Sequence, residues 1–157
     1  MQRRKPANYW DYIRVEDLLN LQSGVDPSEA DLSDDEVRFI VIHQIDELWF
    51  KVVLRELVAA RNLFARPLVP EDALAGAVNS LKRITLCFEL AAQHFRLMET
   101  MRTQDYLLFR DKLNPASGFQ SAQMREIEVL MGLPDEDRIP FGNEVSYLDA
   151  LKSHDGS

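Results

Sequence analysis

One segment restricts the possible folds more than any other. Residues 33–64 contain neither proline nor glycine, and Pro67 ends the run soon afterwards. The run opens on the letters SDDE, Ser33 to Glu36, a capping box in which the serine hydroxyl accepts from the third helical amide while Glu36 reaches back. At about 1.5 Å per residue, this segment predicts a helix roughly 45 Å long.

Three further helices follow from the same signals. They are expected from near Pro70 to about Met101, from about Thr103 to Leu113, and from about Ser121 to Met131 with Gly132 as the C-terminal cap. Alternating polar and β-branched residues are missing, so strands are not expected. Two long helices with a short connection predict an all-α bundle with two long antiparallel helices plus shorter helices.

Charge and composition exclude several classes of function. The net charge is −8, which disfavours nucleic acid as a partner. No apolar stretch is long enough to span a membrane, and no apolar run follows the basic residues 3–5, so we expect neither a membrane protein nor a signal peptide. Cys87 is the only cysteine and is expected to be a reduced core residue, which favours a cytoplasmic location.

His43 is the first candidate for chemistry. Helical spacing places Phe39, His43, Glu47 and Lys51 on one stripe, with Glu47 and Lys51 as an expected local ion pair. Isoleucines and a valine surround His43, so it is expected in a partly desolvated place. Two interpretations stay open for it: a satisfied structural group, or a hydrogen-bonding or proton-handling residue in a pocket.

The other histidines and the common catalytic motifs add little. His94 is expected to be structural and His154 solvated. Their spacing contains neither HxxxH nor HExxH, so no metal site is expected within this chain. GxSxG, a glycine-rich phosphate loop and CxxC are all missing from the sequence.

Arg110 is the second candidate. It follows Tyr106 by four residues, so the two side chains are expected on one helix face. Its guanidinium matches a carboxylate in bidentate fashion, beside a loop in which Gly118 permits close approach and Ser117 offers a hydroxyl. A structural salt bridge is the alternative interpretation.

Four segments together resemble the amino-terminal half of the tryptophan 2,3-dioxygenases. They occur in the family's order and at its spacing, from about Tyr9 to Gly132: NYWDYIRVEDLLNLQ, EVRFIVIHQIDELWFKVVLRELVAARNLF, LKRITLCFELAAQHFRLMETM and DYLLFRDKLNPASGFQSAQMREIEVLMG. The resemblance implies an all-α homotetramer that binds haem b. It also implies a cytoplasmic enzyme of tryptophan catabolism, in the kynurenine pathway, that converts L-tryptophan and O2 to N-formylkynurenine.

The resemblance also implies roles for individual residues. His43 matches the family's distal histidine, which accepts the indole N–H and does not ligate iron, and Phe39 matches a phenylalanine packed on the indole. Arg110 matches the arginine that pairs with the substrate carboxylate, and Tyr106 the tyrosine beside it. The remaining matches are Ser117 and Gly118 in the loop over the haem, and Tyr9, Tyr12 and Ile13, which complete the pocket of an adjacent subunit.

The family's proximal haem ligand lies in a half that has no counterpart here, so no metal ligand is expected in this chain. Three explanations stay open: a portion of a longer dioxygenase, a short relative that pairs with a polypeptide supplying the ligand, or a haem-free module that binds an aromatic amino acid. A related haem-dependent monooxygenase of aromatic amino acids is a further alternative.

We expect three parts in the chain. Residues 1–32 form an N-terminal docking segment whose clustered aromatics pack either on this chain or on a neighbouring one. Residues 33–132 form the helical core with the distal-side pocket, and residues 133–157 a linker and the start of a further helix.

Overall fold

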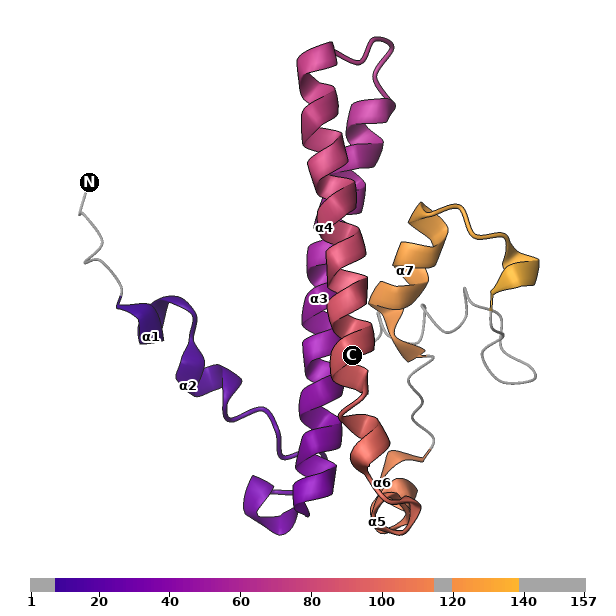
Figure 1. The fold of residues 1–157 in the computed structure, drawn as a ribbon. Helices are drawn as coiled ribbons and strands as arrows, with labels where there is room; N and C mark the ends of the chain where they lie inside the picture. The colour runs from indigo at the N-terminus through magenta and orange to yellow at the C-terminus, as the bar shows by residue number, and fades with distance from the viewer. Residues whose placement is uncertain (1–7, 115–119, 139–157) are drawn as a thin grey trace.

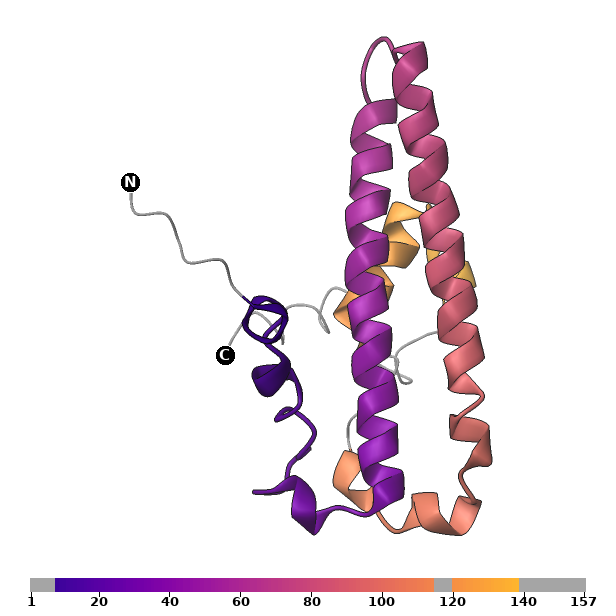
Figure 2. The same cartoon turned by 60° about the vertical axis from the view of Figure 1, so that its left-hand side comes forward.

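A long helical hairpin dominates the structure. The computed structural model describes residues 8–114 and 120–138, and these contain helices and turns but no strand. Helix α3 (Asp34–Phe64) and helix α4 (Glu71–Phe95) run antiparallel along most of their length (Figures 1 and 2). The all-α architecture and the antiparallel pair are therefore confirmed.

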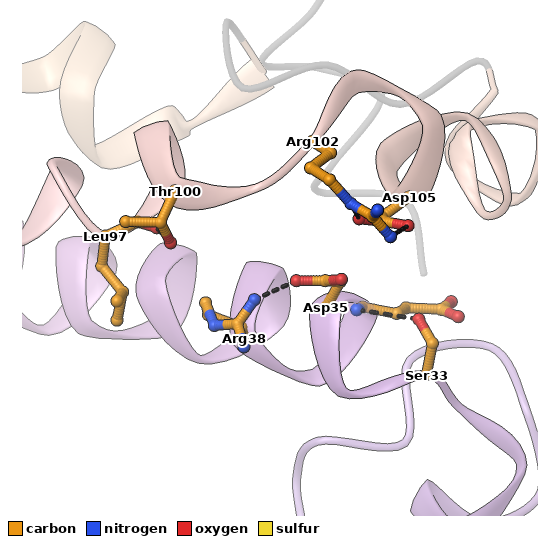
Figure 3. Close-up of polar contacts among 8 residues, drawn as sticks. Ser33, Asp35, Arg38, Leu97, Thr100, Arg102 and Asp105 are labelled. Carbon is orange, nitrogen blue, oxygen red and sulfur yellow. Dashed lines mark hydrogen bonds and ion pairs between the residues drawn. The ribbon is translucent and has the colours of Figure 1, made fainter.

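The start of α3 confirms one half of the expected capping box. The Ser33 hydroxyl accepts from the backbone amide of Glu36 at 3.2 Å, as Figure 3 shows. The Glu36 carboxylate does not reach back; it is buried and accepts from the Lys112 ammonium at 2.9 Å. Asp35, which pairs with Arg38, places a carboxylate at the positive end of the helix dipole (Figure 3).

Helix α4 is shorter than predicted. It ends at Phe95, not near Met101, and a 3₁₀ turn, η2 (Met98–Thr100), follows it. The chain then becomes extended at Met101 and Arg102, where the Arg102 guanidinium forms two hydrogen bonds to Asp105, at 2.7 and 2.9 Å (Figure 3). This local pair holds the start of the next helix, so the prediction of one continuous helix to Met101 is wrong.

The predicted third helix is broken into two. Helix α5 (Thr103–Leu107) and helix α6 (Arg110–Leu113) are separated at Leu108 and Phe109, where the Phe109 backbone leaves helical geometry at φ −119° and ψ −3°. The Phe109 side chain is almost completely buried, with its ring 5.5 Å from Phe39 and 5.4 Å from Tyr106, both edge-on. Burial of this ring accompanies the turn, which spacing along the sequence does not reveal.

Helix α7 (Ala122–Leu130) packs against the middle of the hairpin (Figure 1). The core that joins them contains Val53 of α3, Ile84 and Cys87 of α4, and Ile127 of α7. The Ser121 hydroxyl caps the first turn, and Gly132 at φ +75° ends the helix with a 3.0 Å bond from Leu133 N–H to the carbonyl of Glu128. A final 3₁₀ turn, η4 (Asp135–Asp137), follows.

The N-terminal segment lies to one side of the hairpin (Figures 1 and 2). It contains α1 (Tyr9–Tyr12), α2 (Val15–Leu18) and the 3₁₀ turn η1 (Glu29–Asp31). Tyr9 and Tyr12 are 76% and 79% exposed, so these aromatics do not pack on their own bundle in this structure. In the described part of the chain, no helix is long and apolar enough to cross a membrane.

Ile127 provides a test of this packing. Its side chain is 1% exposed at the contact of α7 with the hairpin, so Ile127→Ala should lower the free energy of unfolding by about 2–4 kcal/mol, through lost burial and the cavity left behind. Val129→Ala on the same helix, where the side chain is 46% exposed, is the matched control. Denaturant unfolding measures both, and equal losses would contradict the proposed core.

Candidate functional site

One large hollow lies between the short helices and the end of the hairpin that contains the first half of α3 and the last turn of α4. Its volume is about 1170 Å³, larger than typical ligand pockets of roughly 300–1,000 Å³. Helices α3, α5, α6 and α7 and the end of α4 all contribute to its wall. Aromatic rings and arginines from five different elements line it: Phe39, His43, Phe95, Tyr106, Arg110 and Arg125.

His43 is held in a defined orientation on this wall. Its Nδ1 lies 2.7 Å from the carbonyl oxygen of Phe39, one turn earlier on α3. Since a carbonyl only accepts, Nδ1 must carry the proton, and Nε2 of the neutral ring is left as a hydrogen-bond acceptor. The ring also lies 4.1 Å from the Phe39 ring and 6.5 Å from the Phe95 ring, between centroids.

Tyr106 and Arg110 lie together at the rim of the same hollow. The Arg110 guanidinium carbon is 5.8 Å from the centre of the Tyr106 ring, so the two side chains stay close although the helix between them is broken. The Tyr106 ring lies 6.3 Å from that of Phe39. Arg110 is exposed, and its donors are accessible to a carboxylate that enters the hollow.

Asp46 and His94 form a partly buried polar contact between α3 and the end of α4. The Nε2 atom of His94 lies 2.9 Å from Oδ1 of Asp46, and neither atom has an aligned hydrogen bond to any described residue. Burial raises the pKa of Asp46, while the imidazoles of His94 and His43 act in the opposite direction. The structural role expected for His94 stays a prediction, and Asp46 is the residue that it contacts.

A second buried pair lies on α7. Arg125 Nη1 is 2.9 Å from Oε2 of Glu128, and both side chains are about nine-tenths buried. The Nε atom of Arg125 is buried and has no acceptor among the described residues. A buried donor of this kind suits an anionic group in the hollow, since an unpaired donor is costly.

Glu47 does not form the ion pair predicted with Lys51. Its carboxylate and its backbone carbonyl both accept from the Gln123 amide, at 2.7 and 2.8 Å, and the described residues contain no Glu47–Lys51 pair. The tertiary contact replaces the local one because it satisfies two acceptors where α7 meets α3. This bond fixes the wall that carries Arg125.

Lys112 anchors the helix that carries Arg110. Its ammonium lies 2.7 Å from Asp26 of the N-terminal segment and 2.9 Å from the buried Glu36 of α3. Hydrogen bonds to these two carboxylates raise the pKa of Lys112 above its ordinary value of 10.5. The position of α6, and with it that of Arg110, therefore depends on a contact between three separate segments.

The structure brings four of the predicted site residues to one hollow: Phe39, His43, Tyr106 and Arg110. Tyr9, Tyr12 and Ile13 are exposed and do not line it. Ser117 and Gly118 lie outside the described residues.

Several wall residues escaped the sequence analysis, above all Asp46, Phe95, Arg125 and Glu128. Asp46 follows His43 by three residues, and that helical spacing is the signal that could have identified it. The others come from elements whose placement no local pattern predicts. Among the described residues, no group of three or more histidine, cysteine or carboxylate side chains is arranged to hold a metal ion.

The Lys112 contact predicts a pH dependence of stability. Because the folded pKa is raised, its contribution is complete below about pH 10.5 and is lost as the pH rises through the folded pKa. The melting temperature of Lys112→Met should therefore lie below that of the unmodified protein at neutral pH and approach it in alkali. Thermal unfolding from about pH 7 to about pH 12 measures the difference. Lys51→Met, at an exposed position of α3, is the control; a gap that stays constant would contradict the assignment.

Comparison with known proteins identifies the family of the chain. The sequence profile described as tryptophan 2,3-dioxygenase matches residues 2–157. The tryptophan 2,3-dioxygenase of Sorangium cellulosum is 59% identical over 98% of this chain, and tryptophan 2,3-dioxygenase 2 of Ralstonia nicotianae is 54% identical over 98%. Tryptophan 2,3-dioxygenase B of Danio rerio is 39% identical over 90%.

The chain spans 37%, 42% and 35% of the length of these three relatives. The matches nevertheless run through all the elements that build the hollow, from the N-terminal segment to α7. The chain belongs to the tryptophan 2,3-dioxygenase family.

Proposed function

We propose that this chain forms the substrate side of a haem-dependent tryptophan 2,3-dioxygenase, which converts L-tryptophan and O2 to N-formylkynurenine. One observation carries the proposal: an imidazole acceptor, an aromatic wall and an arginine fork line one hollow. Such a set matches the three chemical features of tryptophan, namely an indole N–H, a flat apolar ring and a carboxylate. Family membership supports the reaction.

His43 would bind the indole. Its Nδ1–H is already engaged with the Phe39 carbonyl, so Nε2 accepts the indole N–H without any change of tautomer. Phe39 is 4.1 Å from His43 and supplies a flat surface against which the indole packs. Together they fix the plane of the ring, which is the requirement for placing one particular bond next to a reactant.

Arg110 would bind the amino-acid end. Its fork pairs with the carboxylate in bidentate fashion, and stacking near Tyr106 limits the conformations of the side chain. The carboxylate then lies at the rim of the hollow and the indole toward His43. Binding in this direction gives a reason for the position of Arg110, a permanently charged residue that directly follows the apolar residues 107–109.

The hollow also fits a haem group. A space of about 1170 Å³ exceeds the needs of one amino acid, and the buried Arg125 Nε lacks an acceptor that a propionate would supply. Phe50 and Met124 add apolar surface to the wall for a macrocycle. When bound, haem would supply the iron that activates dioxygen; its proximal ligand would come from outside this chain.

The exposed N-terminal aromatics fit an assembly. Tyr9, Tyr12 and Ile13 would cover the hollow of a neighbouring copy in a homotetramer, since they are exposed here and lie away from their own hollow. Docking of this kind removes apolar surface from water on both chains. The same contact would close the rim at which Arg110 lies.

Arg110→Ala tests the carboxylate contact. Because Arg110 is exposed at the rim, the loss should be about 1.5–3 kcal/mol, or about 10- to 150-fold in the Kd for tryptophan. Calorimetric titration of the haem-loaded protein measures it. Tryptamine, which lacks the carboxylate, should bind both forms equally, and Arg55→Ala on α3 controls for loss of a surface arginine. Equal weakening for both ligands would contradict the role.

His43→Ala tests the indole contact. Turnover of tryptophan should fall about 10- to 100-fold, because one orienting hydrogen bond is lost, while haem content stays unchanged. Haem absorption per polypeptide and N-formylkynurenine formation measure the two quantities. His43→Gln keeps a hydrogen-bond acceptor and should recover part of the rate. Loss of haem from His43→Ala would place this histidine on the wrong side of the iron.

A further inference from the structure

We propose that Lys112 is a positioning residue that sets the distance between the two ends of the substrate site. By holding α6 against α3, its ammonium fixes Arg110, the partner of the carboxylate, relative to His43, the partner of the indole. The inference rests on the proposed function, since it concerns the length of the ligand that these two residues bind. Lys112 is not among the residues that line the hollow, so it acts on the ligand through other residues.

Helix α6 needs anchors outside itself. It contains four residues, and a helix of about one turn is not stable alone. Its N-cap is Phe109, whose side chain has no acceptor for the amides of the first turn. Before Arg110, the buried Phe109 ring packs edge-on against Phe39 of α3. After Arg110, the Lys112 ammonium donates to carboxylates of two other segments, so the arginine lies between an apolar anchor and a charged one.

Glu36 refers the charged anchor to α3. This residue is in the first turn of that helix and is 5% exposed, and its carboxylate accepts from Lys112 at 2.9 Å. A buried carboxylate is costly unless it is paired, so α6 cannot move away from α3 here without leaving a charge unpaired. Phe39 and His43 follow on the same helix and line the hollow. One rigid element therefore carries both the anchor for Arg110 and the acceptor for the indole.

Asp26 adds a second carboxylate to the anchor. It accepts from Lys112 at 2.7 Å, and its side chain is 27% exposed, against 7% for Glu36. The N-terminal segment that carries Asp26 is itself fastened to α3. There the Gln22 amide donates to the side chain of Gln44 at 2.7 Å, and the Gln44 amide donates to a backbone carbonyl of the segment at 2.7 Å. The ammonium is thus held by two groups whose positions α3 fixes.

This arrangement has a consequence for specificity. An indole acceptor and a carboxylate fork at a fixed separation suit one length of chain between the ring and the carboxylate. A loosened α6 would allow Arg110 to follow a carboxylate on a longer chain. Lys112 therefore determines how well the site distinguishes ligands by length, whereas binding of the ring itself depends on Phe39 and His43.

Two indole acids test this length preference. Indole-3-propionate carries its carboxylate as far from the ring as tryptophan does, and indole-3-butyrate carries it one methylene further. The unmodified, haem-loaded protein should bind the propionate more tightly, and in Lys112→Met the ratio of the two Kd values should fall about three- to tenfold. The KM for tryptophan should rise while kcat changes little, because His43 and Phe39 still hold the ring. Calorimetric titration measures the ratio, and N-formylkynurenine formation measures KM and kcat.

Three further variants separate positioning from stability. Lys112→Met leaves the Glu36 carboxylate buried without a cation, and adding Glu36→Gln removes that charge, so the double variant should recover part of the lost stability. It should not recover the length preference, because no ion pair holds α6. Lys112→Arg keeps a cation and should retain both properties. Arg83→Met is the matched control, since it breaks the Arg83–Glu56 pair between α4 and α3, at 3.1 Å and away from the hollow, and should leave the ratio unchanged.

Each outcome decides the question. A reduced ratio in Lys112→Met and in the double variant, with a normal ratio in Lys112→Arg, supports the inference; if Lys112→Met does not fold, the double variant carries the test. An unmodified protein without the length preference, an unchanged ratio in the variants, or a ratio that recovers together with stability overturns the inference and leaves the proposed function standing. An unmodified protein that does not bind tryptophan, or that binds it no better than Arg110→Ala does, would instead overturn the proposed function.

Discussion

Helix α3 serves the core and the candidate site with one face at different turns, and this double use governs the rest of the structure. Val53 and Ile42 are buried on it, whereas Phe39, His43 and Asp46 lie along the wall of the hollow. A helix presents neighbours only at intervals of three and four residues, so the spacing of the site is set by the same geometry that packs the core. Movement of α3 would therefore disturb both together.

Besides the apolar core, polar contacts hold the elements around α3. Lys112 joins α6 to Asp26 and Glu36, Gln123 joins α7 to Glu47, and His94 joins the end of α4 to Asp46. Contacts of this kind are directional, so they place a side chain more definitely than apolar packing does. Removing one partner leaves another group buried and unsatisfied, which makes the arrangement sensitive to single substitutions.

The sequence predicted the parts of this structure that depend on neighbours along the chain. The start of α3 at Ser33 and its end at Phe64, and the glycine cap at Gly132, follow from local signals, and the structure confirms them. The break at Phe109 was missed, because burial of Phe109 against Phe39 and Tyr106 is a tertiary effect. The end of α4 at Phe95 was also missed; there a 3₁₀ turn and an extended segment precede the Arg102–Asp105 pair that starts α5. The Glu47–Lys51 prediction failed for the same reason, since a residue from α7 competed for the carboxylate.

The ionisable side chains around the hollow have a cost in stability, and this cost indicates what the hollow is for. Asp46, His94, Arg125 and Glu128 are largely buried charged or ionisable side chains, and buried ion pairs are often no more stable than apolar residues that fill the same volume. A chain under selection for stability alone would gain little from four such groups around one space. Their arrangement around His43 and Arg110 is better explained by a ligand that carries its own charge and its own hydrogen-bond donor, because such a ligand completes contacts that the empty protein leaves open.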